Sequence, residues 1–343
     1  MASAGEFQES HSPRREMRLQ DTLKETLRYE MGRDPRVFVM GEDVALFGGS
    51  YGVTRGLMQE FGADRVRDTP ISEAAIIGLA IGAAINGLRP VVEIQFCDLL
   101  PLCMDQLTTI AARYYYQTGG RISVPLVVRT KFGTRPGGGP SHSSCNHGAF
   151  IHFPGLKIIA PATPADAKGL LLSAIRDPNP VLCFESQHLY GTTGPVPEGD
   201  YTVPIGLATV RRTGKDLTII TCGGMVLKVD DAAERLKEKG IDVEIIDLRS
   251  LAPLDKNTIL ESVAKTRNAM VVDEGWVIGG LCPEIVALVQ ENLFRVLRGP
   301  VLRVGASPLP PPYSPALLEA VIPDVEKIVA AALQVVEGAA HSG

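Results

Sequence analysis

Residues 68–96 read DTPISEAAIIGLAIGAAINGLRPVVEIQF, a polar start followed by a long apolar run and then by a strand-like segment. Ser72 is placed to cap a helix, Glu73 falls in its first turn, and Asn86 with Gly87 forms a C-terminal stop. The segment therefore predicts a helix that leads directly into a strand, which is the repeating unit of α/β proteins.

The predicted helix is apolar on every face between residues 74 and 85, so we expect it to be buried on every side. Gly78 and Gly82 lie one turn apart and would let another backbone approach closely. Close packing of this kind would explain why two glycines, which lower helix propensity, occur inside the helix. The helix is a candidate interface, and we expect homodimers or aggregates when the chain is expressed alone.

Strand and helix patterns alternate on both sides of this stretch, which predicts parallel sheets wrapped by helices. Glycine and proline crowd residues 186–205 and interrupt the alternation. We therefore expect an α/β chain with two parallel-sheet domains. The expected divisions are a disordered N-terminus at 1–16, a first domain at 17–190, a linker at 191–205 and a second domain at 206–343.

The composition excludes several classes of protein. A formal net charge of -5 gives no electrostatic reason to bind nucleic acid or anionic lipid. No apolar run approaches the roughly 20 residues that span a bilayer, and the N-terminus lacks a signal-peptide pattern. The six cysteines are scattered without a C-x-x-C pair, as in reduced cytosolic thiols. The sequence predicts a soluble, cytoplasmic protein.

The pattern G-x-S-x-G at residues 48–52 matches the nucleophile elbow of hydrolases. An elbow needs a strand that runs directly into the turn, whereas the strand predicted here ends near Gly41. We therefore favour an ordinary glycine-rich turn.

His142, Cys145 and His147 share one glycine-rich loop, with His152 nearby, and this suggests zinc. A structural zinc site has four ligands, usually with a second paired cluster, and the sequence shows no such cluster. A single catalytic histidine in an active-site loop is the better functional interpretation, and a solvent-exposed loop histidine is the alternative.

Glu73 has two interpretations. A carboxylate in a first turn is a helix cap, stabilised by the helix dipole by about 0.3–1 kcal/mol. If it is buried, it needs a donor, and a cofactor ring nitrogen is one such donor. Glu42 and Asp43 follow a strand at its carboxyl end, where α/β ligands bind, although they could also be simple loop acids.

Three blocks then resemble a known family: residues 68–96, SHSS…HFPGLKIIAPATPADAKGLLLSAIRDPNPVL within 141–182, and VEIIDLRSLAPLD at 243–255. Over residues 17–336 the chain resembles the β subunit of the thiamine diphosphate-dependent decarboxylating component of 2-oxo acid dehydrogenase complexes. This group includes pyruvate, branched-chain and acetoin dehydrogenases. The resemblance implies a transketolase-like pyrimidine-binding domain followed by a transketolase C-terminal domain. It also implies an α2β2 heterotetramer that docks on a dihydrolipoyl acyltransferase core.

In that family the α subunit holds the diphosphate through Mg²⁺ with a G-D-G motif, and this chain has no G-D-G. The resemblance therefore implies thiamine diphosphate shared between two chains, with Mg²⁺ held by the partner. The implied reaction is oxidative decarboxylation of pyruvate or a related 2-oxo acid, with acyl transfer to a lipoyl group. Three alternatives stay open: an acetoin dehydrogenase β subunit, the C-terminal half of a split transketolase, and a docking subunit without chemistry.

Site residues follow from the resemblance position by position. Glu73 matches the glutamate that bonds the aminopyrimidine ring and donates a proton there. His142 matches a loop histidine that handles substrate or lipoyl protons. Glu42 matches an acid near the cofactor, and Gln95 is expected on the strand that faces it.

The chain departs from the family at Leu99, where relatives commonly place Phe or Tyr beside the pyrimidine. Weaker stacking on the ring is the expected result. Phe96 is the nearby aromatic residue that could compensate, but we expect it to point to a different face of the strand.

The resemblance also implies a structural potassium ion, because five positions match its ligands in some relatives: Leu126, Ala174, Ile175, Asp177 and Asn179. Backbone carbonyls with one carboxylate suit a hard monovalent cation. A plain helix end is the alternative interpretation of this loop.

Overall fold

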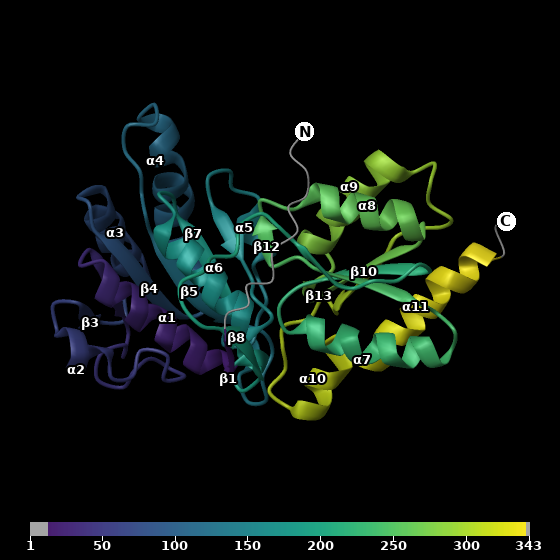
Figure 1. Ribbon diagram of the computed structural model, residues 1–343, viewed down its shortest axis with the longest axis horizontal. Coiled ribbons are helices and arrows are strands. Elements are labelled where there is room, and N and C mark those ends of the chain that lie inside the picture. The colour runs from purple at the N-terminus through teal and green to yellow at the C-terminus, as the bar shows by residue number, and fades with distance from the viewer. Residues whose placement is uncertain (1–12, 341–343) are drawn as a thin grey trace.

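A computed structural model of the protein describes residues 13–340, which form two sheet-and-helix units side by side (Figure 1). The first half of the chain contains β1 (Arg14–Arg18), α1 (Leu19–Arg33), β2 (Val37–Gly41), α2 (Leu57–Phe61), β3 (Val66–Asp68), α3 (Glu73–Ile85), β4 (Arg89–Phe96), η1 (Cys97–Cys103), the π-helical turn η2 (Gln106–Ala111), α4 (Ala112–Gln117), β5 (Val127–Phe132), η3 (Gly139–Ser141), α5 (Gly148–Ile151), β6 (Lys157–Ile159), α6 (Pro164–Arg176), β7 (Val181–Ser186), η4 (Gln187–Leu189) and β8 (Thr193–Pro197). The second half contains β9 (Thr209–Arg212), β10 (Leu217–Thr221), α7 (Met225–Glu238), β11 (Val243–Asp247), β12 (Ser250–Ala252), α8 (Lys256–Thr266), β13 (Ala269–Trp276), α9 (Leu281–Leu293), β14 (Leu302–Ala306), α10 (Pro315–Val321) and α11 (Val325–Ala340).

The first sheet has the strand order β12-β6-β7-β5-β4-β2-β3, and every neighbouring pair is parallel except β12 with β6. Strands β2, β5 and β7 are buried along their whole length, as expected for a sheet that is covered on both faces. Helices α1 and α6 pack together over one face, while α3 packs on β4 and η1 at the other.

The second sheet has the order β14-β13-β10-β11-β9, with only the edge strand β9 antiparallel to its neighbour. Helices α7 and α11 cover one face, and α8 and α9 cover the other (Figure 1). The predicted α/β class is confirmed, and the central strands of both sheets are parallel. Each sheet also carries one antiparallel edge strand that the sequence pattern did not predict.

The two units share part of their core. Strand β12 belongs to the second half of the chain but pairs with β6 of the first sheet. Phe132 and Phe150 of the first unit lie in the same buried cluster as Ile220 and Leu281 of the second. The first unit is therefore completed by residues beyond position 206.

The prediction of a disordered N-terminus over 1–16 is wrong for its last residues. Arg14–Glu16 belong to β1, which pairs antiparallel with β8 in a separate two-stranded sheet. The side chains of β1 are mostly exposed, so backbone hydrogen bonds rather than an apolar pattern order this strand. Strand β8 lies inside the expected linker at 191–205, and residues 1–12 lie outside the described part of the chain.

Helix α3 begins and ends where the sequence predicts, with Ser72 and Asn86 at its cap positions. The Ser72 hydroxyl, however, donates to the Pro70 carbonyl and makes no capping bond. The expectation of burial on every side is wrong within this chain, because Leu79 is 66% exposed on the outer face. A Cβ added at Gly78 or Gly82 would meet no atom within 4 Å, so the close approach expected there does not come from residues 13–340.

Four charged side chains lie fully buried in the middle of the first sheet. The Arg129 guanidinium donates to Glu185 Oε1 over 2.7 Å and to Glu93 Oε2 over 3.0 Å, and the Lys131 ammonium also pairs with Glu93. Burial alone would raise the pKa of Glu93, but Lys131 and Arg129 outweigh it and lower that pKa to about 2. Two cations and two carboxylates therefore balance inside the sheet.

The turn at residues 48–52 lies against this buried group. Gly48, Gly49 and Gly52 all have positive φ, and a Cβ at Gly49 would come within 2.9 Å of a Glu93 carboxylate oxygen. Strand β2 ends at Gly41, before the turn, and Ser50 is exposed. The segment is an ordinary glycine-rich turn, as predicted.

Replacing Arg129 by Met should lower the free energy of unfolding by about 3–5 kcal/mol, because Glu93 and Glu185 would then share one buried cation. Urea titration followed by circular dichroism measures the change. The control is Arg235→Met, which removes an ion pair with Glu326 that is exposed on both sides and should have little effect. Equal losses in the two variants would contradict the importance assigned to the buried charges.

Candidate active site

The candidate site lies at the carboxyl ends of adjacent parallel strands. Glu42 directly follows β2, Gln95 lies near the end of β4, and His142 follows β5 in the next loop. Because β2, β4 and β5 are neighbours in the sheet, their carboxyl ends meet at one edge.

Glu73 is the first residue of α3 and is only 6% exposed. No hydrogen bond or ion pair of its carboxylate is found within residues 13–340. Its charge adds to the effect of burial, which raises the pKa of the Cys103 thiol to about 12. The residue is buried as a whole, but its carboxylate oxygens are not among the fully buried polar atoms that lack a partner, so solvent or a ligand can reach them. This favours a ligand partner over a simple cap.

Glu42 is half-buried beside Glu73. Burial raises its pKa, and repulsion from the Glu73 and Asp43 carboxylates raises it further. The Gln95 side-chain amide donates to the Glu42 carbonyl over 3.5 Å. Three of the residues predicted around the cofactor, Glu42, Glu73 and Gln95, are thus brought together.

His142 is half-buried and held from two sides. Its Nδ1 lies 2.9 Å from the Ser141 hydroxyl, and its ring meets Phe96 edge-on with 4.8 Å between centroids. The Arg135 guanidinium lies 5.1 Å from the same Phe96 ring. Phe96 follows Gln95 on β4, so it links the loop histidine to the strand that carries the predicted cofactor contact.

Leu99 lies on η1, the 3-10 helix that packs on α3, and is half-buried against the core. Its aliphatic side chain offers no aromatic face for stacking. Phe96 packs edge-on against His142, and its expected position on a different face of the strand stays a prediction.

The five predicted potassium ligands lie around the end of α6. Arg89 Nη1 donates to the carbonyls of Ile175 and Asp177, over 2.8 Å and 3.2 Å. Further oxygens of the set also have internal donors: Leu126 O accepts from Val181 N, Ala174 O accepts from Asp177 N, and the Asp177 carboxylate accepts from Asn179 N and Lys157. Arg89 thus already supplies positive charge to two of the expected ligands.

His142, Cys145 and His147, which the sequence suggested as zinc ligands, do not all lie together in the structure. Cys145 and His147 meet Asp273 of β13, whereas His142 contacts Ser141 and Phe96. Sequence reasoning missed Asp273 because it lies 126 residues from His147 and follows an ordinary apolar strand pattern. No local signal pointed to this pairing.

Comparison with known proteins adds to this geometry. Residues 15–193 match the family described as Transketolase, pyrimidine binding domain, and residues 206–328 match Transketolase, C-terminal domain. The mitochondrial pyruvate dehydrogenase E1 component subunit beta-1 of Arabidopsis thaliana is 43% identical, over 92% of this chain and 88% of that protein. The chain belongs to the transketolase-like family of dehydrogenase β subunits. The resemblance inferred from the sequence is therefore confirmed.

Other members of this β-subunit family show its range. The beta subunit of acetoin:2,6-dichlorophenolindophenol oxidoreductase from Cupriavidus necator is 41% identical, over 95% of this chain and 99% of that protein. The 2-oxoisovalerate dehydrogenase subunit beta of Bacillus subtilis is also 41% identical, over 92% and 98%. A solved structure described as "Split gene transketolase, inactive beta4 tetramer" has a TM-score of 0.77 at 22% identity, covers 93% of this chain and 98% of that one, and shows the common fold. Within residues 13–340 no helix is long and apolar enough to cross a membrane.

The Glu73→Gln variant of this β subunit should show a lower pKa at Glu42, because one repelling charge is removed. Burial, the larger cause, remains, so the pKa should stay above its ordinary value. Carboxyl ¹³C chemical shifts measured against pH report the change, and Glu60→Gln on α2 is the control. An unchanged Glu42 pKa would show that the two carboxylates do not interact.

Proposed function

We propose that this chain is the β subunit of a thiamine diphosphate-dependent 2-oxo acid dehydrogenase. It would act with an α subunit that holds the diphosphate through Mg²⁺, and would pass an acyl group to the lipoyl arm of an acyltransferase core. The observation that carries the proposal is the buried Glu73 carboxylate, which has no donor among the described residues and lies beside Glu42. The relatives support it, since they are named as β subunits of pyruvate, acetoin and 2-oxoisovalerate dehydrogenases.

Glu73 and its neighbours fit the aminopyrimidine end of the cofactor. Thiamine diphosphate, when bound, supplies the nucleophilic carbon that attacks the substrate carbonyl. Glu73 would share a proton with a ring nitrogen, and this would satisfy the buried carboxylate. Because the pKa of Glu42 is raised, Glu42 and Glu73 together would tend to hold one proton. The Gln95 amide would keep the Glu42 backbone in place.

His142 would move protons on the substrate side of the site. Its Nδ1 contact with Ser141 and its edge-on contact with Phe96 fix the ring, which leaves Nε2 as the nitrogen available to a substrate or lipoyl group. His142 is half-buried, so a reactant can reach it. We therefore assign it the role of a general acid or base.

The outer face of α3 supports assembly with another chain. Ile71 is 81% exposed just before the helix, and Leu79 is 66% exposed on it. Gly78 and Gly82 lie open beside them, which would allow a second helix to approach closely. An apolar face of this kind suits a permanent contact between subunits.

Acetoin is the second candidate substrate, favoured by the Cupriavidus relative that matches 95% of this chain and 99% of its own length. Acetoin carries no carboxylate, so its cleavage releases an aldehyde and no carbon dioxide. With dichlorophenolindophenol as electron acceptor, dye reduction with carbon dioxide release identifies a 2-oxo acid. Dye reduction with acetaldehyde release identifies acetoin, and ketol transfer between sugars would identify a split transketolase.

With a candidate α subunit, Glu73→Gln should leave assembly intact and lower dye reduction by at least about a hundredfold, the usual effect of losing a general acid. Calorimetric titration with thiamine diphosphate and Mg²⁺ should show binding by the pair and none by the isolated chain. Glu60→Gln, an exposed carboxylate on α2, is the matched control. Full activity in Glu73→Gln, or tight cofactor binding by the isolated chain, would overturn the proposal.

We also retain the structural potassium ion as a proposal. The Ile175 and Asp177 carbonyls each keep a second lone pair beside the bond from Arg89, so they could still contact a cation. Bound potassium stabilises only the folded state, so the melting temperature should be higher in potassium chloride than in choline chloride of equal ionic strength. Identical melting temperatures would argue against bound potassium and would favour the alternative, that the loop after α6 is a plain helix end.

A further inference from the structure

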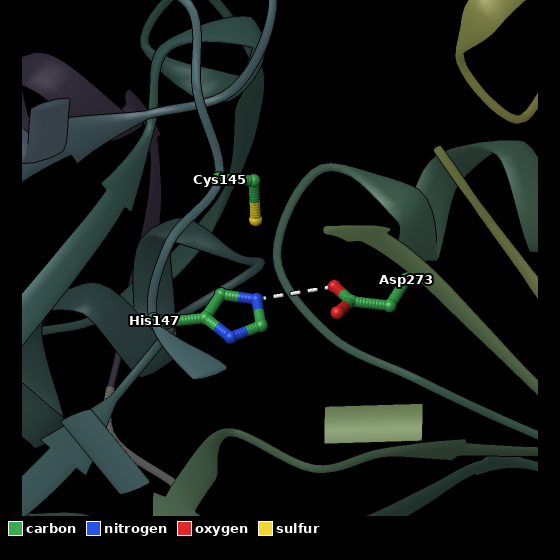
Figure 2. A group of neighbouring side chains, drawn as sticks. All are labelled: Cys145, His147 and Asp273. Carbon is green, nitrogen blue, oxygen red and sulfur yellow. Dashed lines mark hydrogen bonds and ion pairs between the residues drawn. The ribbon is translucent and has the colours of Figure 1, made fainter. Parts of the chain in front are cut away.

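A second group of reactive side chains lies where the two units meet. Cys145 and His147 lie between η3 and α5, and Asp273 approaches them from β13 (Figure 2). The Cys145 sulfur, the His147 Nε2 and an Asp273 oxygen all lie within 4.8 Å of one another. The Nε2–Oδ1 distance is 3.1 Å.

All three side chains are withdrawn from solvent: Cys145 is 6% exposed, His147 1% and Asp273 1%. Asp273 Oδ2 has no hydrogen-bond partner among the described residues, and Figure 2 shows both carboxylate oxygens turned toward the imidazole. An ion pair with a protonated His147 would satisfy one oxygen only. A buried carboxylate left half-satisfied is costly, and a cation between the groups would remove that cost.

Thiolate, imidazole and carboxylate are the ligand types that zinc takes in proteins. Zinc bonds of about 2.0–2.3 Å place tetrahedral ligand atoms about 3.3–3.8 Å apart, so His147 and Asp273 are already close to the required spacing. The Cys222 sulfur lies 4.0 Å from the same Asp273 oxygen but outside the group of three whose ligand atoms all lie within 4.8 Å of one another, so it must move closer to become a fourth ligand. Sulfur ligands favour zinc over magnesium or calcium.

The surroundings hold Asp273 in place and leave room beside it. Its neighbour Glu274 accepts hydrogen bonds from the Thr134 amide and hydroxyl, over 2.7 and 2.8 Å, and lies 3.1 Å from His188 Nε2. A Cβ at Gly275 would come within 2.8 Å of Asp273 Oδ2, so glycine makes space for the carboxylate. A cavity of about 120 Å³ adjoins all three ligands and gives an ion a route to the group.

We propose that Cys145, His147 and Asp273, with Cys222 as the fourth donor, form a structural zinc site that joins the two units. Burial, with a contribution from Asp273, raises the pKa of the Cys145 thiol well above its ordinary value, so the free thiol is protonated. Zinc binding releases that proton, and the Cys222 proton, to solvent. The proposal does not rest on the catalytic role of Glu73 and is tested separately from it.

The test uses the full-length chain without a polyhistidine tag, stripped with a chelator and titrated with Co²⁺ as a spectroscopic substitute for zinc. We expect one equivalent to bind with the visible bands of tetrahedral cobalt and a thiolate charge-transfer band. Zinc should also raise the melting temperature. Cys145→Ser and His147→Gln should each weaken binding about tenfold or more, whereas His152→Gln, an exposed histidine just after α5, should not.

Octahedral cobalt bands, or no binding by the unaltered chain, would overturn the proposal without any variant. Retention of the same spectrum in both Cys145→Ser and His147→Gln would also overturn it and assign the binding to other donors. Circular dichroism identifies a variant that fails to fold. In that case the cobalt spectrum of the unaltered chain tests the proposal. A buried ion pair with a neutral thiol would give no thiolate band.

Discussion

The buried balance of charge in the first sheet is the constraint on which the site depends. Glu93, Arg129, Lys131 and Glu185 come from three adjacent strands, and all lie on one face of the sheet. A slip of one residue in any of these strands would turn its charges to the other face and leave partners unpaired. The pairing register is therefore strongly specified, and with it the positions at which β4 and β5 end. The register of β4 with β5 shifts between Ile94 and Phe96, so Gln95 lies at that irregularity, and the loop that carries His142 follows the end of β5.

The candidate site at the ends of these strands contains polar groups that lack hydrogen-bond partners within the described part of the chain. Glu73 is buried, no donor to its carboxylate is found among residues 13–340, and the neighbouring Glu42 has a raised pKa. The apolar outer face of α3 begins at the same helix start. In the proposed function, the cofactor contact of Glu73 and the contact with a partner chain would both be made by α3.

Much of this architecture could be predicted from the sequence. The ends of α3, the alternation of strands and helices and the grouping of Glu42 with Glu73 follow from local pattern and family resemblance. The burial of Arg129 and Lys131 could not, because their charges argue against a buried strand until the carboxylates of neighbouring strands are known. Asp273 lies too far along the chain from His147 to be paired with it by spacing. The exposure of α3 was also missed, because an apolar helix does not reveal whether its own chain or another one covers it.

The pairing of β12 with β6 has a consequence for how the chain can be divided. A fragment that ends near residue 205 would lack β12 and would leave β6 as an open edge, with unpaired backbone groups available to any other strand. It would also lose the second-unit side chains that complete its core. The two units have different central sheets, but neither can fold completely without the other. Heat or denaturant should therefore unfold them in one transition. Gene fusions or circular permutations of this subunit must keep residues 250–252 attached to the first sheet.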